Sequence, residues 1–242
     1  MSIPVEPVMH STQPIHPPVA APKSERRLPV DRAWVPIRSL GPRHRERIAA
    51  HLTALDASDR YLRFGYPATD AQMSKYVDML DFEQDEVFGI FNRRLELIAM
   101  AHLAHAGVVP APGRPAMSEF GVSVLPKARS RGFGRRLFEH AMLHARNRGV
   151  EMLFIHALSE NVAMLKIARR AGATVERDGS ESEAWLKLPP DSLASHVGEM
   201  VEQQAAELDY HLKLRARQVG EILGVLSEVK TSMSKVAHIA EE

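Results

Sequence analysis

Residues 118 to 134 read Ser118-Glu-Phe-Gly-Val-Ser-Val-Leu-Pro-Lys-Ala-Arg129-Ser-Arg-Gly132-Phe-Gly134, and they carry the strongest structural signal in the chain. Its apolar start predicts a strand from Ser118 to Leu125. A basic loop with two glycines follows, and the next residues predict a helix from about Gly132 to Arg148. A strand, a glycine-containing loop and a helix N-terminus in this order bind anions, because backbone N–H groups converge there and the helix dipole adds positive potential.

The loop fits one nucleotide-binding pattern and excludes two others. The sequence contains no GxxxxGK[ST] phosphate loop, and it has too few glycines for a GxGxxG dinucleotide fingerprint. It fits [RQ]xxGx[GA] from Arg129 to Gly134. Because Gly132 and Gly134 lack a Cβ atom, the backbone can approach a diphosphate closely. Four arginines supply further charge, although only some can face one ligand: Arg129, Arg131, Arg135 and Arg136.

The surrounding sequence alternates short apolar runs with helical periods, which is typical of an α/β domain. Glycines and prolines separate the elements. We expect strands at Trp34–Arg38, Glu86–Phe91, Leu95–His105, Met152–Ala157, Val175–Arg177 and Ala184–Leu188. We expect helices at Pro42–Leu55, Asp70–Leu80, with Asp70 as the cap, and from near Ser159 or Asn161 to Gly172.

The two ends of the chain differ from this central domain, which we place at residues 33–190. Eight of the 16 prolines fall in the first 36 residues, so we expect residues 1–32 to form a disordered arm. In residues 191–242, apolar residues recur with 3,4 spacing from Val201 to Ala240, which predicts an amphipathic helix and a coiled coil. This helix can pair with a second copy, fold back on the domain or bind another protein. We favour a homo-oligomer formed through it.

The amino-acid composition limits which kinds of binding partner and which cellular compartment we expect for the protein. Among 242 residues, 31 Lys and Arg face 30 Asp and Glu, so no global charge attracts nucleic acid or an anionic membrane. The absence of cysteine excludes disulfides, thiolate metal sites and cysteine nucleophiles. No apolar run is long enough to span a bilayer, and the N-terminus lacks a secretion-signal pattern. We therefore expect a soluble, cytoplasmic protein that binds neither nucleic acid nor membranes.

Together these motifs resemble the GNAT superfamily of acyl-CoA N-acyltransferases over about Trp34 to Leu188. Within it, the chain looks most like the catalytic domain of bacterial Pat-type protein-lysine acetyltransferases. The segment Asp59–Phe64, a glutamate ten residues before Arg129 and Met164 after Asn161 carry this likeness. The resemblance implies a mixed, mostly antiparallel sheet with splayed fourth and fifth strands, flanked by helices. It also implies an acetyl-CoA cosubstrate and an amine acceptor, such as a protein lysine.

The resemblance assigns the cofactor site. A backbone N–H near Val122 would polarise the thioester carbonyl, with Val124 on the pantetheine side and a strand bulge marked by Gly121. Asn161 would bind the cofactor, although an Asn at this position can equally well cap the following helix. The loop residues implied in holding the diphosphate are Arg129, Ser130, Arg131, Gly132, Phe133, Gly134 and Arg135.

Acetyl transfer to a lysine needs a base, because the amine has a pKa near ~10.4. The resemblance points to Glu119 as the general base, and Glu160 and His156 are the runners-up. Many GNAT enzymes carry a tyrosine as general acid seven residues after this Asn, where the chain has Ala168. Water, Ser159 or no acid at all would then serve the departing thiolate, whose pKa is about 8.5.

Other readings stay open. The acceptor can be a small amine, such as a polyamine, an amino acid or an antibiotic, or the domain can be a noncatalytic acyl-CoA-binding module that signals through its helical tail. His140 and His144 have metal-capable spacing, but no nearby carboxylate or third ligand is evident from the sequence, so we expect a packed or solvated pair and no metal site. We expect Arg60–Tyr66 to form a lid over the acceptor site or a structural turn.

Overall fold

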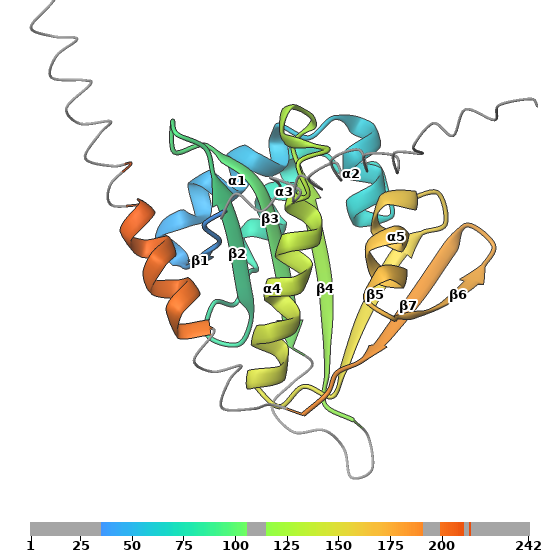
Figure 1. Ribbon diagram of the computed structural model, residues 1–242. Helices are drawn as coiled ribbons and strands as arrows, with labels where there is room; N and C mark the ends of the chain where they lie inside the picture. The colour runs from blue at the N-terminus through green and yellow to red at the C-terminus, as the bar shows by residue number, and fades with distance from the viewer. Residues whose placement is uncertain (1–34, 106–114, 191–198, 211–212, 214–242) are drawn as a thin grey trace, which may run out of the picture. The chain divides into compact units, whose positions relative to one another are not determined.

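The computed structural model describes residues 35–105, 115–190, 199–210 and 213. They form a seven-stranded sheet in the order β1-β2-β3-β4-β5-β7-β6 (Figure 1), in which β4 and β5 are the one parallel pair among the described strands. The strands are β1 (Arg38–Leu40), β2 (Glu86–Phe91), β3 (Leu97–His105), β4 (Met117–Val124), β5 (Met152–Leu158), β6 (Thr174–Asp178) and β7 (Glu181–Lys187). The helices are α1 (Arg45–Thr53), α2 (Ala57–Phe64), α3 (Asp70–Asp78), α4 (Phe133–Asn147) and α5 (Val162–Arg170).

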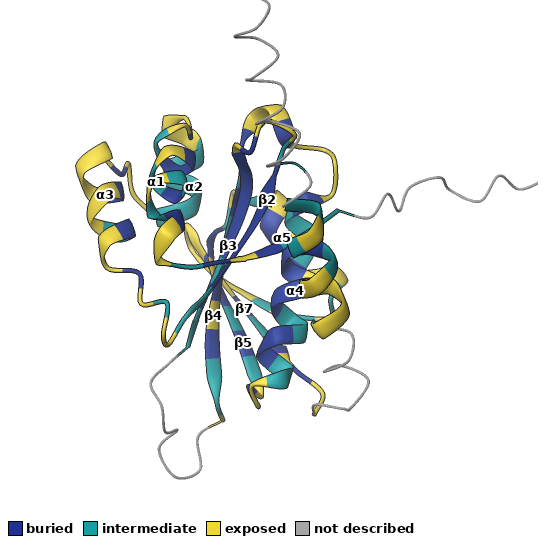
Figure 2. Cartoon of the chain, turned by 90° about the vertical axis from the view of Figure 1, so that its left-hand side faces the viewer, coloured by how far each residue is buried: buried dark blue, intermediate teal, exposed yellow. Residues whose placement is uncertain are grey.

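Helices cover both faces of the sheet. Figure 2 shows α1, α2 and α3 on one face and α4 and α5 on the other. Phe120 of β4 is fully buried, and its ring lies 5.0 Å from that of Phe138 in α4. On the opposite face, Ile48 and Leu52 of α1 are buried. This arrangement confirms the mixed, mostly antiparallel sheet with flanking helices. None of the described helices is long and apolar enough to cross a bilayer.

Two expected elements differ near the N-terminus of the domain. The first strand begins at Arg38, because Pro36 has no N–H to donate to a ladder, whereas Trp34 lies outside the described residues. The segment expected as a lid or turn is mostly helix α2. Asp56 caps this helix by accepting a hydrogen bond from the backbone N–H of Asp59, and Gly65 ends it in the left-handed conformation at φ +78°.

The cap of α3 is also corrected. Thr69, not Asp70, accepts a hydrogen bond from the backbone N–H of Gln72, and the Gln72 side chain accepts one from the backbone N–H of Thr69. Asp70 instead pairs with Arg60 at 2.7 Å. This pair and the Arg60 hydrogen bonds to the carbonyl oxygens of Leu55 and Thr53 hold α2 against its neighbours.

The expected proline-rich arm lies outside the described residues, as do residues 191–198, 211–212 and 214–242 of the expected coiled coil. Residues 199–210 are helical and fold back on the domain through one face. Ala206 is buried, and Arg38 pairs with Glu207 at 2.8 Å and stacks over the Tyr210 ring at 3.6 Å. Val201 and Leu208, two positions of the expected coiled-coil seam, stay 61% and 67% exposed. Self-association through this seam remains a prediction.

The histidine pair of α4 is packed inside the protein. His140 and His144 are both buried, and their Nδ1 atoms bond to Glu202 at 3.0 Å and to Glu86 at 2.8 Å. Burial alone would raise the pKa of Glu86, but hydrogen bonds from His105 and His144 lower it to about 2. This finding confirms the packed reading of the pair, whose partners are carboxylates.

Candidate active site

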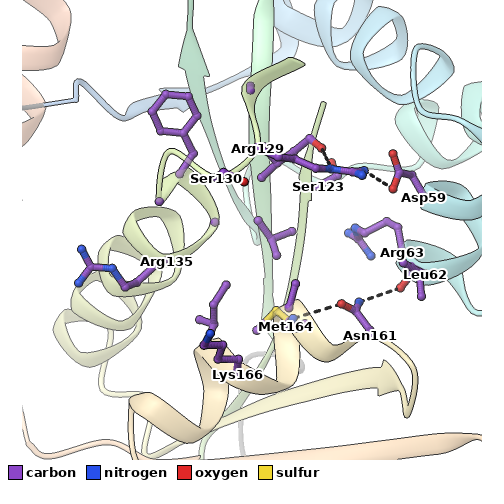
Figure 3. Close-up of a pocket in the computed structure, with 18 of the residues that line it drawn as sticks. Asp59, Leu62, Arg63, Ser123, Arg129, Ser130, Arg135, Asn161, Met164 and Lys166 are labelled. Atoms are coloured by element: carbon purple, nitrogen blue, oxygen red, sulfur yellow. Dashed lines mark hydrogen bonds and ion pairs between the residues drawn. The ribbon is translucent and has the colours of Figure 1, made fainter. Parts of the chain in front are cut away.

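A cleft of about 680 Å³ lies between β4, the loop that follows it, α2 and α5 (Figure 3). It gathers nine of the ten residues assigned to the cofactor. Arg131 is the exception among them, because its guanidinium group lies over the Phe133 ring, 5.0 Å from the ring centre. The nine that line the cleft are Val122, Val124, Arg129, Ser130, Gly132, Phe133, Gly134, Arg135 and Asn161.

The loop after β4 has the backbone that an anion cradle needs. Ser130 and Gly132 both adopt positive φ, at 60° and 75°, a conformation in which successive N–H groups can converge on an anion. The first amides of α4 have no partner four residues earlier in the helix and are free to bind a ligand. Gly134 is needed for close packing, since a Cβ there would lie 3.3 Å from the Ile167 side chain of α5.

Strands β4 and β5 separate beside this loop. They pair in parallel only from Met117 to Glu119, although β4 itself continues to Val124. The splay between the fourth and fifth strands is therefore confirmed. The bulge expected at Gly121 is not, because the register between β3 and β4 runs without a shift from Ser118 to Val124.

Gly121 serves a different purpose, which involves α2. A Cβ at this position would collide with the guanidinium group of Arg63. Gly121 also lies directly opposite His102 in the β3–β4 ladder. The missing side chain thus leaves room for an arginine to lie flat against the strand.

Helix α2 supplies cleft residues that the motif analysis missed. Asp59 forms an ion pair with Arg129 of the loop, and Leu62 accepts a hydrogen bond from the Asn161 side chain at 3.3 Å. Both contacts are drawn in Figure 3, where Arg63 points into the same space. The sequence signals that could have predicted α2 are Asp56, which caps its start, and Gly65, which ends it. The remaining cleft residues outside the motif include Ser123, Lys166 and Arg170.

Asn161 uses both ends of its amide within the protein. Its Oδ1 accepts a hydrogen bond from the backbone N–H of Met164 at 3.1 Å, which caps α5, and its Nδ2 donates to Leu62. The structure therefore shows the capping role. Asn161 also lines the cleft.

A second pocket of about 230 Å³ adjoins the cleft. Glu119 lines it from the last paired position of β4, and His156 lines it from β5. Glu119 is exposed, and its side chain forms no hydrogen bond or ion pair with another described residue. His156 pairs with Glu181 at 3.5 Å. Glu160, the other runner-up for the base, lies outside the lining of both cavities.

The cleft and the pocket share one wall. Five residues line both: Leu62, Arg63, Val122, Asn161 and Met164. Arg63 is the one cation among them, and Glu119 is the one carboxylate among the described residues of the pocket. The cleft itself carries more positive than negative groups, which suits an anionic ligand. Its charged residues are Asp59, Arg63, Arg129, Arg135, Lys166 and Arg170.

Arg63 is held by a chain of hydrogen bonds. Its Nη2 donates to the Tyr76 hydroxyl at 3.2 Å, which lies 2.8 Å from Nδ1 of His102. The other ring nitrogen, Nε2, lies 3.0 Å from Asp85. Because an arginine only donates and a carboxylate only accepts, the chain runs in one direction from Arg63 to Asp85. Burial lowers the pKa of His102 and raises that of Tyr76, so both stay neutral in the chain at pH 7.

A second buried pair lies behind the cleft. His51 contacts the Ser123 hydroxyl through Nε2 at 2.8 Å and the Leu97 carbonyl through Nδ1 at 2.9 Å. Since a carbonyl only accepts, Nδ1 carries the proton and the Ser123 hydroxyl donates to Nε2. Burial lowers the pKa of His51 to about 4.

The structure offers no hydroxyl acid at the expected positions. Ala168 is fully buried in α5. The Ser159 hydroxyl bonds to the Glu181 carbonyl and the Ser182 hydroxyl, both at 2.8 Å, and Ser159 is outside the lining of both cavities. Ser159 is therefore not placed to act as the general acid, which leaves water or no acid among the alternatives that the sequence suggested.

Comparisons with known proteins agree with this geometry. Residues 53–173 match the model of the family described as "Acetyltransferase (GNAT) family". The fold is similar to the GNAT domain of S. lividans PAT, with a TM-score of 0.53 and 22% identity over 63% of this chain and 89% of that one. It is also similar to a putative acetyltransferase from Acinetobacter baylyi, with a TM-score of 0.52 and 15% identity over 64% and 93%.

A third similar structure is a putative phosphinothricin N-acetyltransferase, with a TM-score of 0.50 and 17% identity over 64% of this chain and 98% of that one. No curated protein matches the sequence significantly. At these identities the solved structures support the fold and leave the acceptor open.

Proposed function

Because the chain belongs to the acetyltransferase (GNAT) family, we propose that it transfers an acetyl group from acetyl-CoA to a primary amine by direct attack in a ternary complex. One observation carries this proposal: β5 leaves β4 after Glu119, beside the wall that joins the cleft to the pocket. The cofactor fills the cleft and the amine enters the pocket. The thioester then meets the amine at the shared wall.

The loop after β4 holds the diphosphate of the cofactor. Its inward N–H groups and the start of α4 bind the phosphate oxygens. Arg135, Lys166 and Arg170 line the same cleft and add positive charge. Beyond Glu119, the pantetheine arm lies along the part of β4 that β5 leaves uncovered.

The chemistry takes place next to Val122. Its backbone N–H polarises the thioester carbonyl, and the amine nitrogen attacks the carbonyl carbon. Before this attack Glu119, directly or through a water molecule, accepts the proton that the substrate ammonium must lose to become a free amine. The C–N bond forms, the C–S bond breaks, and the electron pair leaves with the sulfur. No covalent enzyme intermediate is required.

The pocket favours the side chain of a protein lysine as the acceptor. Its volume of about 230 Å³ is small, below the roughly 300 to 1,000 Å³ of most small-molecule sites. Ile155, Leu158 and Met164 supply apolar walls, and Glu119 supplies one carboxylate. An aliphatic stem that ends in a single ammonium fits such a lining. A polyamine would need several acidic partners.

The test is a coenzyme A release assay over a panel of amines and lysine-containing proteins. Glu119→Gln should reduce turnover on every acceptor and leave acetyl-CoA binding intact. Glu160→Gln, an exposed glutamate outside both cavities, is the matched control and should keep the wild-type rate. A Glu119→Gln protein with a normal rate at every pH would remove Glu119 from the mechanism.

The phosphate cradle is tested with Gly132→Asp, which adds a negative charge and a Cβ at positive φ. Gly149→Asp controls for the backbone, because Gly149 has the same left-handed conformation, at φ +74°, outside the cleft. We expect only Gly132→Asp to lose acetyl-CoA binding. Tight binding without turnover of any amine would instead indicate a noncatalytic acyl-CoA-binding module.

A further inference from the structure

Arg63 occupies the one place where the cofactor and the acceptor meet. It lines both the cleft and the pocket, and Gly121 of β4 gives its guanidinium group room to lie against the strand. Val122, whose N–H faces the carbonyl oxygen in the proposed reaction, is the next residue along this strand. A positive charge is thus fixed beside the bond that breaks.

The guanidinium group of Arg63 is held by Tyr76 and Phe64 and also lines the cleft and the pocket. Nη2 is engaged by Tyr76, and the Phe64 and Tyr76 rings pack against the group, with their centres 5.2 and 5.8 Å from Cζ. Nε and Nη1 form no hydrogen bond with another described residue. These two nitrogens therefore offer three N–H donors to a ligand. Because Asp85 ends the chain through His102 and Tyr76, it orients Arg63 without neutralising it by direct contact.

The departing sulfur lacks a partner in the proposed reaction. The carbonyl oxygen has the Val122 N–H, and the ammonium has Glu119. The sulfur carries away a full negative charge, and the residue at position 168 is an alanine that cannot protonate it. A fixed cation stabilises developing charge without transferring a proton.

We propose that Arg63 stabilises the coenzyme A thiolate as it leaves, and that Tyr76 and His102 are positioning residues for Arg63. This inference rests on the proposed acetyl transfer. The C–S electron pair stays on the sulfur, Arg63 keeps all its protons, and the thiolate is protonated by water after it departs. Arg63 would be catalytic in this role because it touches the reacting sulfur.

The direct test uses coenzyme A alone, so no acceptor needs to be known. The ultraviolet absorbance of the thiolate gives the pKa of the thiol in the bound cofactor. In the wild-type protein this pKa should lie below that of free coenzyme A. Arg63→Met should raise the bound value by about one to two units. Arg93→Met is the matched control, since Arg93 is exposed in the β2–β3 turn, outside both cavities.

Kinetics separate the catalytic role from a structural one. Arg63→Met should lower kcat by roughly a hundredfold with little change in the KM for acetyl-CoA, and Arg63→Lys should restore part of the rate. Tyr76→Phe, which removes only the hydroxyl, should give a smaller loss of kcat and a smaller shift of the thiol. Circular dichroism and thermal unfolding confirm that each variant is folded.

The failures are distinguishable. If Arg63→Met binds coenzyme A with the wild-type thiol titration and keeps its kcat, this inference is overturned and the proposed acetyl transfer stands. If the wild-type protein does not bind coenzyme A, both fall. If Arg63→Met and Tyr76→Phe lose rate only in proportion to lost fold, the role of Arg63 is structural and the inference is overturned.

Discussion

Asp59 of α2 forms an ion pair with Arg129 of the phosphate-binding loop, and its second carboxylate oxygen is buried without a hydrogen-bond partner. The first arginine of the RxxGxG pattern is thus engaged by a carboxylate that also lines the cleft. A diphosphate must compete with that carboxylate for the guanidinium group. The ion pair therefore couples helix α2 to cofactor binding at the loop.

Asp59→Asn should therefore tighten coenzyme A binding. The change removes a negative charge from the cleft and frees Arg129, and we expect Kd to fall roughly fivefold at low salt, about 1 kcal/mol. Isothermal titration calorimetry at two salt concentrations measures it. Asp78→Asn, an exposed aspartate at the end of α3, should leave Kd unchanged. A weaker affinity in Asp59→Asn would show that the pair stabilises the binding-competent cleft.

Gly121→Ala should impair catalysis more than cofactor binding. The new Cβ would collide with the Arg63 guanidinium group and displace it from the strand. We expect kcat to fall with little change in the KM for acetyl-CoA. Gly89→Ala is the matched control, because its Cβ would meet the Leu97 side chain at 2.6 Å in the core. It should cost roughly 1 to 3 kcal/mol of stability and keep kcat per folded molecule.

Acid should destabilise the fold through His51. Its pKa is about 4 in the folded protein and about 6.5 in an unfolded chain. Between these values the unfolded chain takes up a proton that the folded state refuses, so the free energy of unfolding falls as pH drops from 6.5 to 4. The loss should reach at most about 3 kcal/mol. Urea unfolding at a series of pH values measures it.

His51→Gln should flatten this pH dependence, although it also lowers stability at pH 7.5. His44, whose pKa burial and the nearby Arg38 lower to about 4, should account for part of the slope that remains. A His51→Gln protein with the full wild-type slope would contradict the assignment.

The exposed seam of the C-terminal helix should mediate self-association. Val201 and Leu208 face away from the domain, whereas Ala206 packs against it. The double variant Val201→Glu/Leu208→Glu should be monomeric in sedimentation velocity and unfold at the wild-type temperature. Gln203→Glu changes charge at another exposed position of the helix and should assemble normally. A monomeric wild-type protein would refute the prediction.

The sequence could predict the parts of the site that are local. Residues 118 to 134 are continuous in the chain, so strand, loop and helix follow from pattern and glycine placement alone. Glu119 and the loop needed no knowledge of distant contacts to be singled out. Eight of the nine cofactor candidates in the cleft lie between Val122 and Arg135 for the same reason, whereas Asn161 reaches it from the start of α5.

The features that the sequence could not reveal depend on tertiary contacts. Gly121 suggested a bulge, but its missing side chain accommodates Arg63, which lies 58 positions earlier in helix α2. Helix α2 was overlooked because its charged and aromatic residues hid the caps at Asp56 and Gly65. Arg131 belongs to the motif, yet it stacks on Phe133, a choice that spacing cannot reveal.

Because β4 and β5 pair only as far as Glu119, the rest of β4 has an unpaired edge in the middle of the sheet. Unpaired strand edges are where chains adhere to one another, and proteins commonly cover or interrupt them. In the proposed function coenzyme A would cover this edge, so we expect the protein to aggregate less readily when the cofactor is bound. Without coenzyme A, the edge of β4 beyond Glu119, where the proposed reaction takes place, would be open to strands of other chains.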